Sequence, residues 1–170
     1  MAARVRTNDI MSISKTEFAR RRRNLIALMD PNSIAIIPSA DEQVRSRDTL
    51  YPFRQDSDFF YLSGFIEPDA VWVLLPGRRH GQFVVFCRER DPALELWHGY
   101  RAGPEGVCEK YGADDAFPIG DIDEILPGLV EGRVRVYYSM GRSPYFDLHS
   151  LGLFCVILFS GSFFAVPPWE

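Results

Sequence analysis

The sequence predicts an α/β domain with a mixed central sheet flanked by helices. Three observations lead to this prediction. A capped helix opens the pattern, a series of short apolar runs rich in β-branched and aromatic residues follows, and helical segments with a final alternating run come last. Helix, strand, meander, helices and strand in this order are typical of one layered domain around a single core.

The first element is a helix predicted over about residues 15–29. It starts after the capping box Ser14-Lys15-Thr16-Glu17, in which the serine hydroxyl and the glutamate carboxylate each bond a free amide at the helix start. Pro31-Asn32 ends the helix. The basic run Arg20 to Arg23 is expected on the solvated side, with phosphate binding as the alternative. The apolar positions expected to face the core are Phe18, Leu25, Leu28 and Met29.

Four strand candidates follow this helix. Ser33 to Pro38 is a β-branched run bounded by turn residues, which predicts a buried strand. Further apolar runs span residues 59–62, 70–75 and 82–87, and short turn-rich gaps separate them. Gaps of this kind favour antiparallel hairpins over helical crossovers.

The second half of the domain changes to helical segments and turns. Candidate helices lie near Pro104 to Tyr111 and Ile122 to Val130, and Pro127 is expected to shorten the second one. The alternating run Val134 to Met140 predicts a last strand.

The chain divides into three parts: a flexible N-terminus over 1–12, one domain over 13–147 and an atypical apolar tail over 148–170. Residues 151–166 of the tail form an apolar run without a charge. A bilayer span needs about 20 apolar residues, with about 17 as the lower limit, so this run is short for a membrane helix. A membrane-surface tail, a buried core element and an accidental terminus all stay open.

Composition excludes some classes of partner. Nineteen Lys and Arg against 23 Asp and Glu give a net charge of −4, which offers no general attraction to nucleic acid or to an anionic membrane. The cysteines Cys87, Cys108 and Cys155 are odd in number and widely spaced, which favours a reducing, cytoplasmic location. The N-terminus has no apolar run of the kind that a secretory signal needs.

The sequence holds no recognisable catalytic constellation. A nucleophilic triad needs a histidine, and of His80, His98 and His149 only His98 lies in a suggestive setting. No zinc, calcium-loop or phosphate-loop pattern occurs, so no catalytic residue, metal ligand or bound cofactor is predicted for this chain. Three acidic pairs are interpreted as turn and helix-cap carboxylates rather than cation ligands; they are Asp56/Asp58, Asp114/Asp115 and Asp121/Asp123.

Two segments look more specialised than a core requires. Residues 51–65 combine many aromatic side chains with an arginine, a glutamine and two aspartates, and core packing is expected for Phe59, Tyr61 and Phe65. Residues 95–101, ELWHGYR, place Trp97 and His98 beside a glycine in an expected loop. Aromatic residues on loops often serve recognition, and for Trp97 recognition and core packing are equally good interpretations.

These segments resemble the N-terminal domain of aminopeptidase P, the Xaa-Pro aminopeptidase of the creatinase and prolidase group. The resemblance covers residues 13–147. It is carried by FARRRRNLIALM, TLYPFRQDSDFFYLSGFIEPDAVWVLLPG, FCRERDPALELWHGYRAG and EKYGADDAFPIGDIDEILPGL. The resemblance implies a mixed sheet flanked by helices without a metal ligand, because that family holds its two metal ions, usually Mn²⁺, in a separate C-terminal domain.

The resemblance also implies what this part of the enzyme does. It implies a domain that builds homo-oligomers or pairs with full-length aminopeptidase P subunits, and that shapes the cleft for Xaa-Pro peptides. Trp97 matches a tryptophan that reaches the active site of a neighbouring subunit, so Trp97 is the expected substrate-wall residue, with His98 beside it. By itself the chain is expected to be inactive, since the metal-binding domain is missing.

After Asp147 the sequence departs from the family's pattern. The family continues with a polar linker, whereas this chain continues with LHSLGLFCVILFSGSFFAVPPWE. The alternatives are a tail of accidental origin, a stand-alone interaction module that pairs with full-length subunits, and a membrane-surface protein attached through residues 151–166.

Overall fold

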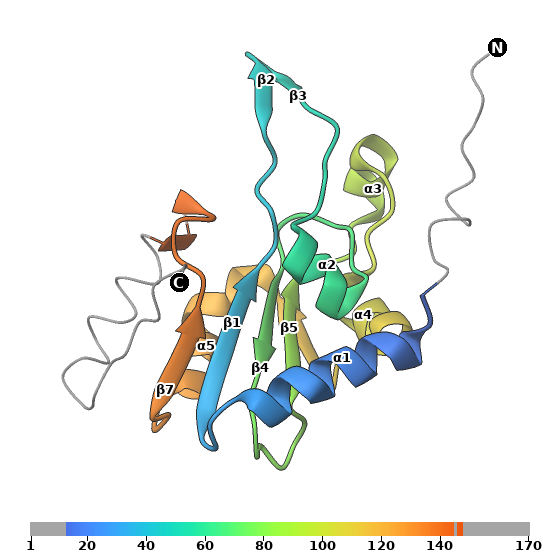
Figure 1. The fold of residues 1–170 in the computed structure, drawn as a ribbon. Helices are drawn as coiled ribbons and strands as arrows, with labels where there is room; N and C mark the ends of the chain where they lie inside the picture. Colours follow the sequence, from blue (N-terminus) through green and yellow to red (C-terminus); the bar gives the residue numbers. More distant parts are fainter. Residues whose placement is uncertain (1–12, 145, 148–170) are drawn as a thin grey trace.

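A mixed sheet forms the centre of the computed structural model, which describes residues 13–144, 146 and 147 (Figure 1). Within this part of the chain, five strands form the sheet in the order β6-β5-β4-β1-β7. The strands are β1 (Ser33–Pro38), β4 (Val71–Leu74), β5 (Phe83–Cys87), β6 (Asp115–Pro118) and β7 (Arg135–Tyr138). The helices are α1 (Lys15–Leu28), α2 (Ser57–Ser63), α3 (Pro92–His98), α4 (Gly103–Tyr111) and α5 (Ile122–Val130), with a 3-10 turn, η2 (Ile119–Asp121), before α5.

Strand pairing confirms the predicted mixed sheet. β1 pairs with β4, and β4 with β5, in antiparallel register, with Ala35 opposite Leu74 and Val73 opposite Val84. The outer pairs, β5 with β6 and β1 with β7, are parallel. The expected hairpin between the runs at 70–75 and 82–87 is therefore present, and β6 is a strand that the sequence did not reveal.

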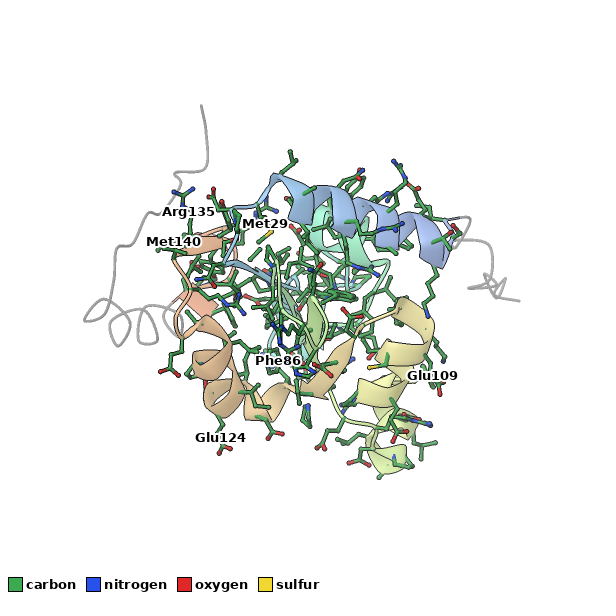
Figure 2. The ribbon with its side chains drawn as sticks, turned by 90° about the horizontal axis from the view of Figure 1, so that it is seen from below. Met29, Phe86, Glu109, Glu124, Arg135 and Met140 are labelled. Carbon is green, nitrogen blue, oxygen red and sulfur yellow. The ribbon has the colours of Figure 1, made fainter. Side chains whose placement is uncertain are left out.

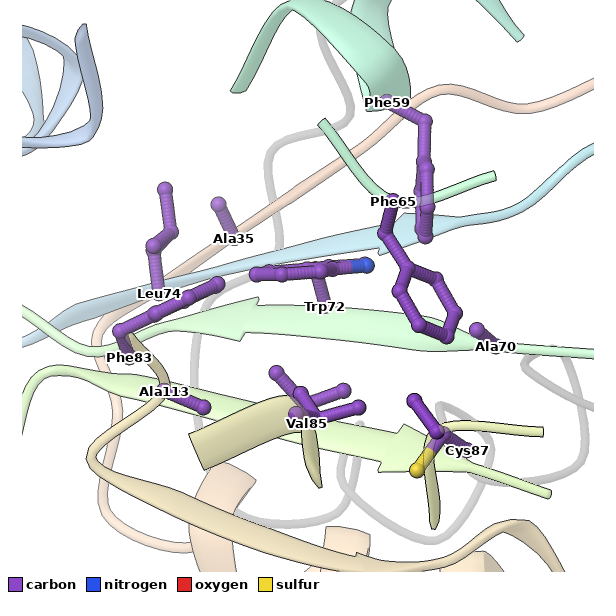
Figure 3. Packing of buried hydrophobic residues seen from close by; sticks show 12 residues of the cluster. Ala35, Phe59, Phe65, Ala70, Trp72, Leu74, Phe83, Val85, Cys87 and Ala113 are labelled. Carbon is purple, nitrogen blue, oxygen red and sulfur yellow. The ribbon is translucent and has the colours of Figure 1, made fainter. Parts of the chain in front are cut away.

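Side chains of successive strand residues alternate between two apolar layers. One layer contains Trp72 and Phe83, whose rings stack at 4.2 Å, and it packs against α2 and α4 (Figure 3). The other layer contains Val73 and Phe86 and packs against α5. Figure 1 shows α1 and α2 in front of the sheet and α5 behind it.

The run at 59–62 was predicted as a strand, and this prediction is wrong. It lies in α2, because Asp56 caps the helix by accepting hydrogen bonds from the amides of Asp58 and Phe59. Gly64 ends the helix at a positive φ of 69°. Phe59 and Phe65 are buried as expected, but the Tyr61 side chain is exposed.

Two expectations for α1 are also wrong. Arg22 is buried rather than solvated, because its guanidinium donates hydrogen bonds to the carbonyls of Leu62 and Tyr111 at the ends of α2 and α4. Leu28, expected in the core, is 84% exposed. The serine of the capping box does accept the Glu17 amide, at 3.2 Å, while the Glu17 carboxylate pairs with two arginines one turn later.

Pro127 does not shorten the helix that contains it. α5 continues to Val130, where the Glu131 amide still bonds the Pro127 carbonyl at 2.9 Å. Packing of Ile122, Leu126 and Val130 against the sheet stabilises the helix against the loss of one backbone hydrogen bond.

A small separate hairpin leaves the end of β1. Its strands are β2 (Val44–Ser46) and β3 (Thr49–Leu50), and Figure 1 shows it projecting away from the sheet. The predicted N-terminus over 1–12 and the tail over 148–170 lie outside the described residues. Between residues 13 and 147, as far as they are described, no helix has the length and apolar character to cross a bilayer.

Candidate functional site

A short helix after β5 carries the two residues that the sequence singled out. Asp91 caps the start of α3, and its carboxylate accepts hydrogen bonds from the amides of Ala93 at 2.9 Å and Leu94 at 3.3 Å. A proline at its first position and a glycine after its last one complete the start and stop signals. The prediction of a loop over 95–101 is thus wrong for 95–98, because the helix that begins after Asp91 continues through these residues.

Trp97 and His98 are the last two residues of α3. The structure describes their backbone, and their side chains lie outside the described part of the chain. Their predicted roles as substrate-wall residues therefore stay predictions. What the structure does describe is how the rest of the chain holds this helix and the segment after it.

The chain just after α3 is held by a cluster of Glu67, Arg88 and Arg101, which we call the Glu67 cluster. Glu67 lies in the turn before β4, and its Oε1 accepts a hydrogen bond of 2.8 Å from the Ala102 amide at the start of α4. Its Oε2 lies 3.8 Å from Nη2 of Arg88. One carboxylate thus connects the turn before β4, the end of β5 and the start of α4.

The Glu67 cluster is largely removed from water. The side chains of Glu67 and Arg88 are 12% and 16% exposed. Within the described residues, Glu67 Oε2 and the Nε atoms of Arg88 and Arg101 are buried without a hydrogen-bond partner. Burial raises the pKa of Glu67, and the Ala102 amide and the two arginines oppose this rise only in part.

A second carboxylate fixes α3 from within. Glu95 Oε1 accepts a hydrogen bond from Arg90 Nε at 3.2 Å and another from the Arg101 amide at 3.4 Å. The hydrogen bond from Arg90 lowers the pKa of Glu95. Beside it, Lys110 Nζ donates to the Tyr100 hydroxyl at 2.6 Å. These contacts connect both ends of the 95–101 segment to β5 and α4.

The aromatic-dense segment at 51–65 has a structural role in the same region. Gln55 donates from Nε2 to the Glu67 carbonyl at 2.9 Å, and its Oε1 accepts from the amides of Ala40 and Asp56. Gln55 therefore holds the backbone of the residue whose carboxylate anchors Ala102. Sequence reasoning overlooked Glu67, because a glutamate beside a proline in a turn looks like an ordinary surface residue.

The acidic pairs act as caps and ion pairs where the structure shows their contacts. Asp114 accepts hydrogen bonds from the amides of Gln82 and Phe83, which connects two neighbouring strands. Asp115 pairs with Arg78 at 2.8 Å. Among the described residues, no group of three or more His, Cys, Asp or Glu side chains could hold a metal ion.

Of the three histidines, the structure describes the side chain of His80 alone. His80 is exposed in the turn between β4 and β5, the side chain of His98 is outside the description, and so is His149. Cys87 and Cys108 are free thiols, and burial raises the pKa of Cys87 to about 12. A thiol with a raised pKa is a poor nucleophile at neutral pH.

Comparison with known proteins gives a consistent result. The family described as "Aminopeptidase P, N-terminal domain" matches residues 18–137. The chain is 43% identical over 137 residues to the Xaa-Pro aminopeptidase of Escherichia coli K12, and 33% identical over 150 residues to human Xaa-Pro aminopeptidase 3. These alignments cover 80% and 81% of this chain but only 31% and 30% of the relatives.

A solved structure shows the same architecture. The aminopeptidase PepP of Pseudomonas aeruginosa superposes with a TM-score of 0.86 and 55% sequence identity. The match covers 91% of this chain and 36% of the PepP chain. The chain thus spans about a third of the length of the proteins that it resembles.

Proposed function

The chain belongs to the aminopeptidase P N-terminal domain family, and from this membership we propose that it is the non-catalytic, assembling and cleft-shaping domain of a Xaa-Pro aminopeptidase. The family match over residues 18–137 is the observation that carries the proposal. Cleavage before proline, and the two Mn²⁺ ions that the resemblance implies, then belong to the catalytic domain of the longer relatives.

The surroundings of α3 support the cleft-shaping part. Trp97 and His98 end a helix that is capped by Asp91 and connected through Glu95 and the Glu67 cluster to the sheet. A helix held by such contacts suits residues that bind a substrate by shape, because the helix then loses little conformational freedom on binding. We assign Trp97 to the wall of the Xaa-Pro peptide cleft, with His98 as its neighbour.

A hybrid enzyme tests this assignment. Residues 13–147 of this chain would replace the matching region of the E. coli relative, and hydrolysis of Xaa-Pro peptides would be measured with Mn²⁺. We expect Trp97→Ala to raise KM at least about tenfold, which corresponds to about 1.4 kcal/mol of lost binding. The matched control is Leu96→Ala, because Leu96 is 82% exposed in the same helix. Equal KM values for the two variants would contradict the role of Trp97.

The assembling part is tested with the chain alone. We expect it to release no N-terminal residue from Xaa-Pro peptides with or without Mn²⁺, and to co-elute with a full-length Xaa-Pro aminopeptidase on size exclusion. Release of amino acid by the pure chain would overturn the non-catalytic assignment. Elution as two separate species would remove the proposed pairing with full-length subunits, and with it the alternative of a stand-alone interaction module.

The cysteines and the tail bear on the proposed location of the protein in the cell. The two described cysteines are free thiols, so we place the protein in a reducing compartment such as the cytoplasm. The alternative of membrane-surface attachment depends on residues 151–166, whose run without a charge is its support. Flotation of the chain with liposomes tests it, and loss of flotation after deletion of 151–170 would identify the tail as the anchor.

A further inference from the structure

A groove of about 630 Å³ lies over β1 and β7, on the side of the sheet where α1 lies. Figure 1 shows α5 behind these two strands and no helix in front of them, among the elements drawn in colour. In Figure 2, Met29 and Met140 lie on the α1 side of the sheet and Glu124 of α5 lies on the opposite side. The groove is lined mainly by apolar side chains, among them Leu25, Leu28, Met29, Ile37, Tyr137 and Met140.

The rim of the groove exposes apolar surface to water. Leu28 is 84% exposed and Met140 is 44% exposed; both line the groove, Leu28 from α1 and Met140 from the segment after β7. Removing apolar side chains of this kind from water is favourable. The groove therefore favours an apolar occupant.

Ion pairs within the chain offset part of the charge in the groove lining. Arg142 pairs with Asp56 and, at 2.9 Å, with Asp58. Ser143 donates to Asp41 at 3.0 Å. The lining holds three aspartates and two arginines, so it has no excess of positive charge to attract an anion or a nucleic acid, and an uncharged peptide segment fits it better.

The chain leaves the described domain at β7, the edge strand that lies under the groove. Tyr138, which lines the groove, donates its hydroxyl proton to Asp147 at 2.6 Å, and the Asp147 carboxylate also accepts from the Gly141 amide at 2.9 Å. Phe146 is buried against the Tyr138 ring, with centroids 5.7 Å apart. Tyr138 and Phe146 pack in the apolar layer on the α5 side of the sheet, so the last described residue is fixed at the edge strand β7, and Arg142, five residues earlier in the chain, lines the groove.

We propose that the apolar tail, residues 151–166, docks in this groove of its own chain. Three residues, 148–150, lie between Asp147 and Leu151, and the four steps of an extended chain between these two residues reach at most about 14 Å. The tail is uncharged, as the groove requires, and its connection to Asp147 gives it a high effective concentration at the groove. Docking would also remove from water a run that is otherwise an aggregation risk.

Disulfide trapping in the full chain tests the proposal, because Cys155 lies in the middle of the tail. Leu28→Cys places a thiol on the groove wall, in a Cys108→Ala background that removes the half-buried thiol of α4. The matched control is Leu96→Cys, since Leu96 is a helical leucine with 82% exposure in α3. Figure 1 and Figure 2 show α3 and β7 on opposite sides of the molecule.

Copper-phenanthroline oxidation of the monomer, followed by peptide mass spectrometry, measures the rate at which the intramolecular disulfide forms. We expect Leu28→Cys to react with Cys155 at least about tenfold faster than Leu96→Cys. A second tail control separates docking from mere tethering. Phe154→Asp with Val156→Asp keeps the tether length and Cys155, and it should reduce the Leu28→Cys rate by about tenfold because a charged segment does not enter an apolar groove.

Three outcomes would overturn the proposal. An unchanged rate with the two aspartates would mean that the tail meets Leu28 only by random encounter. A disulfide that joins two chains, together with a dimer mass by light scattering, would mean that a second copy covers the groove. Flotation with neutral phosphatidylcholine vesicles that protects Leu28→Cys from oxidation would mean that a membrane covers it.

Discussion

The guanidinium of Arg22 lies 4.1 Å from the centroid of the Phe83 ring, inside the apolar layer that α1 covers. From this position it donates to the Leu62 carbonyl at 3.0 Å and to the Tyr111 carbonyl at 3.3 Å. Helix ends carry unsatisfied carbonyls and partial negative charge, so one buried cation stabilises the ends of two helices together. Burial lowers the pKa of Arg22 to about 10, which leaves it charged at neutral pH.

Replacing Arg22 tests this contact. We expect Arg22→Met to lower the free energy of unfolding by about 2–3 kcal/mol, because two buried carbonyls lose a charged donor. Urea unfolding followed by circular dichroism measures the change. Arg23→Met is the matched control, since Arg23 is exposed on the same helix and should change stability by no more than about 0.5 kcal/mol. Equal effects of the two changes would contradict the structural role of Arg22.

Glu67 gives a prediction about pH. Burial raises its pKa in the folded state, so the folded chain binds more protons than the unfolded chain once the pH exceeds the ordinary value of 4.5. The stability contribution of Glu67 is therefore present below that value and is lost as the pH rises through the raised folded-state pKa. Glu67→Gln cannot ionise, and the free energy of unfolding of the wild type should fall relative to this variant over that window.

Removal of the Glu67 side chain has a different expected result. Glu67→Ala takes away the acceptor of the Ala102 amide and the partner of Arg88, which should cost about 2 kcal/mol or more. Hydrogen exchange should also become faster over 99–102, where the anchored segment lies. A global loss of stability without faster exchange in that segment would show that Glu67 does not hold it.

The cap of α3 is tested by a pair of aspartates. Asp91→Ala removes a carboxylate that accepts two amides, and we expect a loss of about 1 kcal/mol, seen as faster hydrogen exchange over 93–98. Asp121 also precedes a helix, but within the described residues its side chain makes no cap bond. Asp121→Ala should thus leave the exchange of α5 nearly unchanged. A similar effect at both positions would argue against the cap.

Gly64 is expected to be intolerant of any side chain. Its φ of 69° disfavours L residues, and an added Cβ would lie 2.6 Å from a ring atom of Phe18. Gly64→Ala should cost more than the roughly 1–2 kcal/mol of the backbone strain alone. Gly77 has a similar φ of 75° with no atom within 4 Å of its added Cβ, so Gly77→Ala isolates the strain. Thermal unfolding of both variants measures the difference.

The pattern of apolar residues along the sequence predicted most strands of the sheet. It failed at an aromatic run that is compatible with both a strand and a helix. The β-branched runs of β1, β4 and β5 alternate between two apolar layers, as their sequences indicate. The run at 59–62 is equally apolar, yet the Asp56 cap and Gly64 make it a helix. The Asp91 cap decides α3 in the same way. In both places the capping aspartate predicts the helix better than the pattern of apolar residues does.

The sequence by itself determined the family, the layered α/β class and the strands of the centre, because these follow from motifs and alternation along neighbouring residues. Tertiary structure alone decided that Arg22 is buried, that Glu67 anchors Ala102 and that a groove opens beside Leu28. The physical reason is sequence separation. Arg22 meets acceptors 40 and 89 residues away, and Glu67 meets an amide 35 residues away. Whether a charged side chain is solvated or buried depends on which distant segments fold against it.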